Sequence, residues 1–405
     1  MKMWQYIVRR VLLVIPVVIG VMTITFVLVS ALPTQTRILS YEGPSKFGTG
    51  PTASCAKLGL PPPAPGVTQC PNPWWTHGIH ALGLNQPIPL QWARYVANSF
   101  SLNWGYTAAF SVASEQLSIG DGTPVAQVLS WYIPYTLELA AISLLFILLF
   151  SIPLGNMSAV LRNRPFDQAV RVFSFSGWAI PTFLLSVLTL LALTAAFGGY
   201  TAICNGSSTP YQLWWGSWPS WSCPPFNGPP YNGVQPSWIG PNFQTYPTHF
   251  PTVDALYHGE WFLAWETIRR MIVPALTIAF TSIAGVLRFV RNSMLEVMNL
   301  EYVRTARAIG VSEGRVIHHH AGRNSLIVTI TVLGLTFAFF IGGFPITELV
   351  WHLNGIGLVL AYSILSPADF GLIFGTTLVF TLIVVAANII VDVLYAYLDP
   401  RVRLG

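Results

Sequence analysis

Acidic side chains are rare inside the apolar stretches of this chain, and they are its first candidates for chemistry. Glu138 lies near the start of one apolar stretch and Asp392 near the end of another. Transport driven by protons or ions needs acidic or histidine side chains near the middle of a membrane. Because these two lie nearer the ends, we favour a structural role in helix packing for both and keep ion coupling as the alternative.

Motifs of the common catalytic sites are absent from the sequence. There is no Gly-x-x-x-x-Gly-Lys-Ser/Thr loop for nucleotide phosphates, no Gly-x-Ser-x-Gly nucleophile turn and no His-Glu-x-x-His zinc helix. The run His318-His319-His320 would point in different directions around a helix, which favours a solvated face over a metal site. We therefore expect no enzyme active site, no metal and no cofactor.

All four cysteines lie in two segments rich in proline, glycine and tryptophan, with Cys55 and Cys70 in the first and Cys204 and Cys223 in the second. This placement favours an oxidising exterior and two disulfides. Closing the shorter loops costs the least entropy, so Cys55–Cys70 and Cys204–Cys223 are the preferred pairs. The other pairings stay open, and a zinc site is the weaker alternative because no Cys-x-x-Cys spacing occurs.

The elements that position these residues are long apolar helices. Of the 405 residues, 53% are hydrophobic and 9% are charged, whereas a soluble domain carries about 25% charged residues. A membrane span needs about 20 apolar residues, and the first run is too long for a signal peptide, whose apolar core has about 7–15 residues. The sequence predicts an all-α integral membrane protein with six transmembrane helices, near residues 7–32, 131–161, 172–197, 271–290, 325–344 and 370–398.

The distribution of basic residues indicates how these helices are oriented. Cytoplasmic flanks carry an excess of Lys and Arg, and six spans with both termini in the cytoplasm place most of the basic residues inside. The exceptions beside a span are Arg269 and Arg270. The net charge of +5 thus reflects membrane orientation, and a nucleic-acid partner is not expected. The basic residues placed inside are Lys2, Arg9, Arg10, Arg162, Arg164, Arg171, Arg288, Arg291, Arg304, Arg307, Arg315, Arg323, Arg401 and Arg403.

This topology divides the chain into a first transmembrane helix (1–32), an extracytoplasmic region (33–124) and a core of five further helices (125–405). The core contains an extracytoplasmic insert (198–267) and a cytoplasmic loop (292–324). The composition of the two outer regions favours turn-rich loops and short strands over regular helix.

The cytoplasmic loop contains the most informative run, Glu301-Tyr302-Val303-Arg304-Thr305-Ala306-Arg307-Ala308-Ile309-Gly310. Good helix formers are followed by Gly310, a natural helix stop, and Ser312 could cap a second helix. A helix, a glycine-centred turn and a second helix would suit a knob that enters the groove of a partner. The alternative is a solvated loop that only satisfies the positive-inside rule.

At these residues the chain resembles the permease subunits of ABC-type importers, most closely the first of the two permeases in the dipeptide, oligopeptide and nickel family. The run is similar to that family's EAA loop, with Arg304, Thr305 and Ala306 at the Glu-Ala-Ala positions and Gly310 at the glycine. Two positions depart from the family pattern: Val328 stands for proline, and Gly322 for a larger apolar residue. The resemblance also covers residues 6–10, 82–90, 136–140, 153–155, 293–297, 323–324 and 398–405.

The resemblance implies a multi-pass permease of the plasma membrane that forms half of the path for peptides or similar small solutes. It also implies a second homologous permease, two separate ATPase subunits that hydrolyse ATP, and an extracytoplasmic solute-binding protein. In that family the EAA loop forms the coupling helix, which implies this role for Glu301, Tyr302, Arg304, Thr305, Ala306, Arg307 and Gly310. Family members carry peptides, nickel, glutathione or oligosaccharides. A stand-alone ion-coupled transporter is the alternative, and a receptor or enzyme built on the outer loops is a third hypothesis.

Overall fold

The computed structural model forms two compact units. Unit 1 comprises Met1–Leu12, Tyr135–Leu353 and Ile383–Gly405, and unit 2 comprises Leu13–Pro134 and Asn354–Leu382. The structure describes residues 3–398 apart from 43–49, 62, 65–66, 109–110, 118, 121, 197–211, 214–215, 218–236, 238–246, 326–328, 331, 334–335, 337–343 and 366–367.

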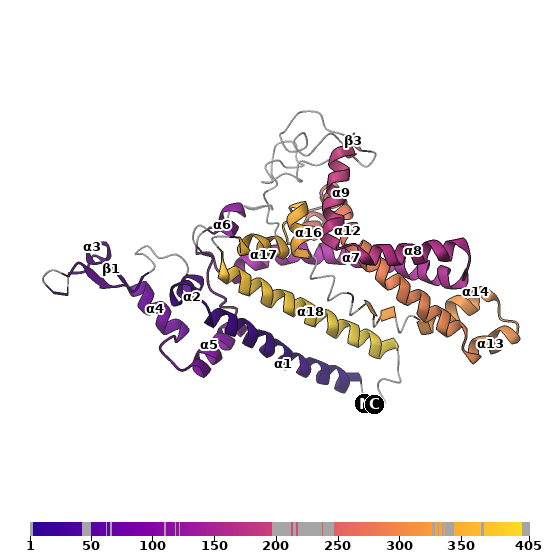
Figure 1. Ribbon diagram of the computed structural model, residues 1–405, viewed down its shortest axis with the longest axis horizontal. Coiled ribbons are helices and arrows are strands. Elements are labelled where there is room, and N and C mark those ends of the chain that lie inside the picture. Colours follow the sequence, from indigo (N-terminus) through magenta and orange to yellow (C-terminus); the bar gives the residue numbers. More distant parts are fainter. Residues whose placement is uncertain are drawn as a thin grey trace. The chain divides into compact units, whose positions relative to one another are not determined.

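Long apolar helices account for most of the predicted spans. In the described part of the chain, 4 helices are long and apolar enough to cross a membrane, and up to 6 spans result if two bent helix pairs each count as one. A mostly helical membrane protein is therefore confirmed. The four long helices, all labelled in Figure 1, are α1 (Met3–Ser30), α7 (Val125–Val160), α12 (Trp261–Met298) and α18 (Phe370–Leu398).

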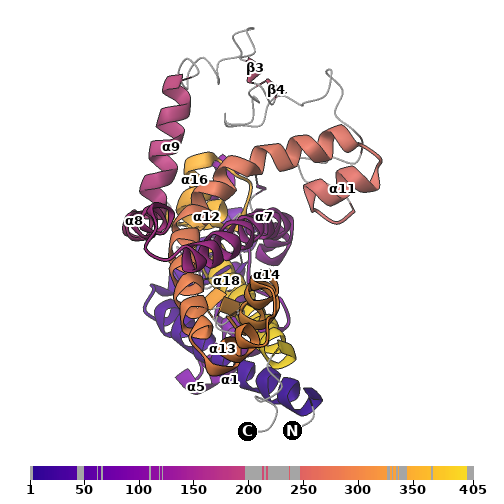
Figure 2. The same ribbon diagram turned by 90° about the vertical axis from the view of Figure 1, so that its right-hand side faces the viewer.

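Helix α12 begins earlier than predicted, at Trp261 rather than near Met271. Its 38 residues extend about 57 Å at roughly 1.5 Å per residue, nearly twice the hydrocarbon thickness of about 30 Å. The short helix α11 (Pro251–Tyr257) packs beside the start of α12 (Figure 2). The sequence reasoning missed this part because it measured only the apolar centre of the helix.

The predicted third span is not one straight helix. Helices α8 (Pro165–Ala179) and α9 (Thr182–Ala196) meet at an angle of 101°. The break falls at Pro181, which has no N–H to donate and disfavours helical backbone in the residue before it. Ile180 accordingly has φ −85° and ψ 120°, an extended conformation.

A second bent pair was not predicted. Helices α16 (Phe344–Trp351) and α17 (Ile356–Ile364) follow one another after a short break and count together as one bent candidate span. On α16 the buried Glu348 carboxylate accepts a hydrogen bond from Thr136 Oγ1 of α7 at 2.8 Å. The predicted span at 325–344 falls mostly on residues outside the described part, and so does Val328. Its described residues 325, 329, 330, 332, 333, 336 and 344 are helical, the last being the first residue of α16.

Small residues let the helices of unit 1 approach closely. A Cβ added at Gly155 of α7 would lie 2.8 Å from Val290 Cβ of α12. A Cβ added at Gly177 of α8 would lie 2.7 Å from Ala284 Cβ, and one added at Gly285 would overlap the Trp178 ring. Close backbone approach between helices is the usual means of packing in a membrane, where no hydrophobic effect drives helices together.

Both acidic candidates of the apolar stretches have partners in unit 1. The Glu138 carboxylate accepts hydrogen bonds from Thr252 N at 3.0 Å and from Thr252 Oγ1 at 2.9 Å, which ties α7 to α11. Asp392 forms an ion pair with Arg10 at 3.0 Å, which ties α18 to α1. These contacts are those expected of groups with a structural role.

The first outer region, which belongs to unit 2, is more helical than its composition suggested. It contains α2 (Thr34–Glu42), α3 (Cys55–Leu58), α4 (Pro73–Leu82), α5 (Ile88–Phe100) and α6 (Val112–Gln116). The prediction of turn-rich loops was wrong here because residues that cap helix ends stabilise helices that the composition did not indicate. For α4, Asn72 accepts a hydrogen bond from Trp74 N, proline occupies the first turn, and Gly83 ends the helix at φ +65°.

The expected short strands and the first disulfide occur together. Strands β1 (Thr52–Ser54) and β2 (Gln69–Pro71) pair antiparallel, with Ala53 opposite Cys70. Cys55 directly follows β1 and is bonded to Cys70. Cys204 and Cys223 lie outside the described residues, so their pairing stays a prediction. Strands β3 (Gln212–Leu213) and β4 (Gly216–Ser217) form a second two-stranded pair.

The Cys55–Cys70 bond predicts a measurable stability difference. It closes a loop with a sequence separation of 15 residues. Closing such a loop lowers the conformational entropy of the unfolded chain and thereby stabilises the folded chain by about 3 kcal/mol. We expect both thiols to resist alkylation until the chain is reduced, and Cys55→Ser to lower the denaturation midpoint of the purified chain. Ser54→Ala at the neighbouring position is the control, and alkylation of Cys55 without reductant would contradict the bond.

A buried carboxylate holds the start of α18 in unit 2. Asp369 accepts hydrogen bonds from Ala108 N at 2.7 Å and from Leu372 N at 3.0 Å, the latter at the first turn of α18. Burial raises the pKa of the Asp369 carboxyl, and these donors oppose that shift. The contact fastens the loop that precedes α6 to the last long helix.

Candidate functional site

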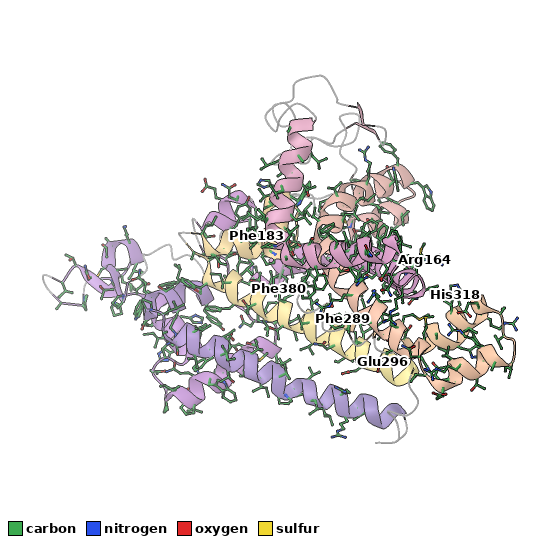
Figure 3. All side chains as sticks on the ribbon, turned by 45° about the vertical axis from the view of Figure 1, so that its right-hand side comes forward. Arg164, Phe183, Phe289, Glu296, His318 and Phe380 are labelled. Atoms are coloured by element: carbon green, nitrogen blue, oxygen red, sulfur yellow. A yellow bond between two sulfur atoms is a disulfide. The ribbon has the colours of Figure 1, made fainter. Side chains whose placement is uncertain are left out.

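Residues 301–321, which we call the hairpin, form two short helical arms connected by a turn after α12 (Figure 1). The first arm is α13 (Glu301–Ala308), and the second is α14 (Glu313–Arg315) continued by a π-helical turn (Val316–Ala321). The predicted order of helix, glycine turn and helix is therefore present. His318 lies on the second arm and Glu296 near the end of α12 (Figure 3).

The turn of the hairpin is a Schellman motif centred on Gly310. Gly310 N donates to Arg307 O at 3.0 Å, and Val311 N donates to Ala306 O at 3.1 Å. Gly310 has φ +83°, a conformation that glycine adopts without the steric cost that a Cβ imposes. Ser312 occupies the cap position of α14, as predicted, although its side chain makes no capping hydrogen bond.

A small apolar cluster holds the two arms together. Val303 and Ala306 on α13 pack against Val316 on the second arm, and Val311 of the turn covers them. Val303 and Val316 are fully buried, and Ala306 is 6% exposed. Ala306 therefore faces inward, where a larger side chain would push the two arms apart.

The other predicted site residues lie on the exposed side of the hairpin. Glu301 pairs with Arg304 at 3.0 Å, and Arg307 pairs with Glu313 of the second arm at 2.6 Å. The hydrogen bond from Arg307 lowers the pKa of the Glu313 carboxyl, and the pair raises the pKa of Arg307. Thr305 is also exposed. This face presents both charge signs in one row.

Tyr302 joins the arms at their base. Its hydroxyl donates to the His320 carbonyl at 3.2 Å and accepts from Asn324 Nδ2 at 2.8 Å. His318 and His319 are exposed, as expected for a solvated run. In the part of the chain that the structure describes, no group of three or more His, Cys, Asp or Glu side chains could hold a metal ion.

The hairpin is attached to the long helices by apolar contacts. Ala321 of the second arm packs in one cluster with Ala159 of α7 and with Met294 and Val297 of α12. The π-helical turn also explains the glycine at position 322, because a Cβ there would lie 2.9 Å from the Ile317 carbonyl oxygen. The departure from the family pattern at this position thus has a local structural cause.

A buried ion cluster beside this attachment was not predicted. Asp167 of α8 is fully buried and accepts hydrogen bonds from Arg291 Nε of α12 at 2.6 Å and Ser158 Oγ of α7 at 2.7 Å. It also accepts from Asn163 N at 2.9 Å and pairs with Arg171 at 3.2 Å. One carboxylate therefore joins three helices of unit 1. Sequence reasoning counted Arg291 only as a marker of orientation.

One exposed residue of the turn was also missed. Ile309 is 74% exposed at the tip of the hairpin, directly before Gly310. An isolated exposed apolar residue needs no explanation on a soluble surface. At the end of a protruding and otherwise charged hairpin, however, it provides an apolar contact point, and its place next to the glycine was the signal available in the sequence.

Comparisons with known proteins agree with this architecture. Residues 151–404 match the family of binding-protein-dependent transport system inner membrane components. The probable D,D-dipeptide transport system permease protein DdpB of Escherichia coli is 35% identical over 80% of this chain and 83% of its own length. The oligopeptide transport system permease protein AppB of Bacillus subtilis is 28% identical over 99% of this chain and 100% of its own length. The di/tripeptide transport system permease protein DppB of Pseudomonas aeruginosa is 27% identical over 99% of each.

These matches decide between the functional hypotheses. The family comprises components of binding-protein-dependent transport systems, so the alternative of a stand-alone ion-coupled transporter is set aside. They also indicate a multi-pass protein of the plasma membrane that is itself not an enzyme. The chain belongs to the inner-membrane components of binding-protein-dependent transport systems, and it is a membrane-spanning permease subunit of an ABC importer.

Proposed function

We propose that the hairpin is the coupling element of this permease and that its tip seats in a groove of an ATPase subunit. The observation that carries the proposal is that the residues of the hairpin divide into a buried apolar set and an exposed set. Val303 and Ala306 fill the interior, whereas Glu301, Arg304, Thr305, Arg307 and Ile309 are exposed on the outside. An apolar tip flanked by charges of both signs suits a contact with an apolar centre and a polar rim.

The hairpin is built to move as one body. Its arms share an apolar cluster, its turn is closed by two backbone hydrogen bonds, and Arg307 bonds Glu313 across the turn. A displacement of the tip would therefore reach Met294 and Val297 on α12, against which Ala321 packs. Nucleotide can shift a transporter between two states only through differential binding, and in this proposal the ATPase subunits supply that difference.

The proposed topology has six transmembrane helices with both termini in the cytoplasm. It is supported by the excess of basic residues in the inner flanks and by the up to 6 spans found among the described residues. Residues 33–124 and 198–267 would then lie outside and 292–324 inside, with the permease core at 125–405. A second homologous permease, two ATPase subunits and an extracytoplasmic solute-binding protein complete the proposed system.

We further propose that the solute is a peptide. The relatives compared above are described as permeases of D,D-dipeptide, oligopeptide and di/tripeptide transport systems. The chain covers most of the length of each, which supports the same class of solute here.

Cross-linking in the assembled transporter tests the coupling proposal. With Ile309→Cys in the full complex, a short thiol-to-amine reagent should link this chain to the ATPase subunit. The link should form more than tenfold faster than with Val67→Cys, an exposed apolar position in the outer region. If Ile309→Cys links only to lipid or to the solute-binding protein, the hairpin is not the coupling element.

A further inference from the structure

Unit 2 contains a pocket of about 80 Å³ that the coupling mechanism does not use. Helices α1, α2, α4, α5 and α18 all contribute to its lining. In the proposed topology, α2, α4 and α5 belong to the outer region of the chain. The pocket would therefore meet solute on the side from which it arrives.

Two arginines and several amide groups provide the polar part of the pocket. Arg37 of α2 donates from Nη2 to Gln91 Oε1 at 3.1 Å. Gln91 is itself fixed, because its Nε2 donates to Gln86 O at 2.8 Å. Arg94 also lines the pocket, and its Nη1 donates to His80 O at 2.7 Å. The lining therefore holds oriented donors and two positive charges.

Arg37 has no anionic partner among the described residues of this pocket. None of the described lining residues is acidic, and the buried Nε of Arg37 has no hydrogen-bond partner in the described structure. Burial lowers the pKa of Arg37, since a half-buried cation loses hydration that the bond to Gln91 replaces only in part. A planar guanidinium in this state is suited to a carboxylate, which it can bind with two parallel hydrogen bonds.

The size and walls of the pocket narrow the choice of ligand. A volume of about 80 Å³ holds several water molecules, at about 10–15 Å³ of such space each, and so accommodates a carboxylate group. Tyr41, Tyr95 and Trp104 are among its walls, and Tyr95 is held by a hydrogen bond to Thr25 Oγ1 at 3.0 Å. Aromatic walls beside a carboxylate site suit the apolar part of the same molecule.

We propose that this pocket binds the terminal carboxylate of the solute on the outer side of the permease, with Arg37 as the principal ligand and Arg94 as a second positive charge. The identity of the solute as a peptide rests on the proposed function above. The pocket takes the carboxylate end of the solute, and the rest of the molecule lies outside it.

Equilibrium dialysis of the purified full chain in phospholipid-free detergent tests this assignment. The probes are a radiolabelled Ala-Phe dipeptide and its C-terminal amide, which differ in the carboxylate. We expect the amide to bind at least tenfold more weakly. Arg37→Gln should reduce dipeptide binding to the level of the amide, and Arg37→Lys should retain part of the preference. Lys57→Gln, an exposed basic position of the same unit, should leave it unchanged.

Equal binding of dipeptide and amide to the unaltered chain would overturn the proposal, and so would a preference that survives Arg37→Gln. The first comparison needs no variant, so misfolding of Arg37→Gln cannot obscure the result. Repeating the assay in phospholipid nanodiscs and with inorganic phosphate shows whether the pocket prefers the dipeptide carboxylate, a lipid headgroup or free phosphate. If phospholipid abolishes the dipeptide preference while free phosphate does not, the pocket is a lipid headgroup site. No ATPase takes part, so this result is independent of the coupling proposal.

Discussion

Gly310→Val is expected to lower solute-stimulated ATP hydrolysis by the assembled transporter at least tenfold while the chain still inserts into the membrane. The cause is the backbone conformation and not a clash with a neighbour. A Cβ at Gly310 would meet nothing within 4 Å, but the residue has φ +83°, which side chains rarely adopt. A β-branched residue in this region of backbone space costs about 1–3 kcal/mol. The turn would relax to negative φ, and the hydrogen bonds from Gly310 N to Arg307 O and from Val311 N to Ala306 O would be lost.

The control for this prediction is Gly310→Asn. Asparagine adopts the left-handed conformation far more readily than valine, so most of the stimulated hydrolysis should remain. The measurement is phosphate release by reconstituted complexes, with and without solute and binding protein, normalised to the amount of assembled complex. Full stimulation with Gly310→Val would show that the geometry of the hairpin turn does not couple hydrolysis to transport.

Local patterns carried much of the architecture. The apolar run at 370–398 predicted α18 at the bounds it has in the structure, because an uninterrupted apolar stretch has no other stable conformation in lipid. Gly310 was recognised as a helix stop because the left-handed conformation after a helix is a property of single residues. Such features depend on neighbours in the sequence and are therefore visible in it.

The bent helix pairs were harder to predict from the sequence. A span is recognised by its length and hydropathy, and neither shows where a helix changes direction. Pro181 lies inside the predicted third span. Prolines are tolerated within membrane helices, so Pro181 alone did not decide between a kink and the 101° bend. Helices α16 and α17 are each too short to be recognised as a span, and the sequence analysis assigned no element between the fifth and sixth predicted spans.

Contacts between distant residues could not be predicted from one chain. Ala306 belongs to the predicted docking set, yet it packs inward on Val303 and Val316, because the second arm folds back on the first. Arg37 and Gln91 are far apart in sequence and meet in one pocket. Likewise, Arg291 has the charge that orientation requires, but only the fold brings Asp167 to it.

Asp167→Ala is expected to destabilise the chain by roughly 3–5 kcal/mol, the usual cost of leaving one member of a buried ion pair unpartnered. Arg291 has a side chain 13% exposed and would lose both bonds to the carboxylate, from Nε at 2.6 Å and from Nη2 at 3.0 Å. The hydrogen bonds from Ser158 Oγ and from Asn163 N would also be lost. Urea denaturation of the purified chain measures the change in the free energy of unfolding. Elution as a monodisperse species is the check that the purified variant is folded.

Two further variants separate the ion pair from the packing around it. Arg171→Ala removes a partner whose side chain is 42% exposed, and it should cost no more than about 1 kcal/mol. The double variant Asp167→Leu with Arg291→Met replaces the pair by apolar groups and should recover most of the lost stability, because no buried charge is left unpaired. If the double variant is stable but its stimulated ATP hydrolysis stays low, the ion pair also sets the angle at which α12 presents the hairpin. A single Asp167→Ala chain as stable as Arg171→Ala would show that the three helices are held together by apolar packing alone.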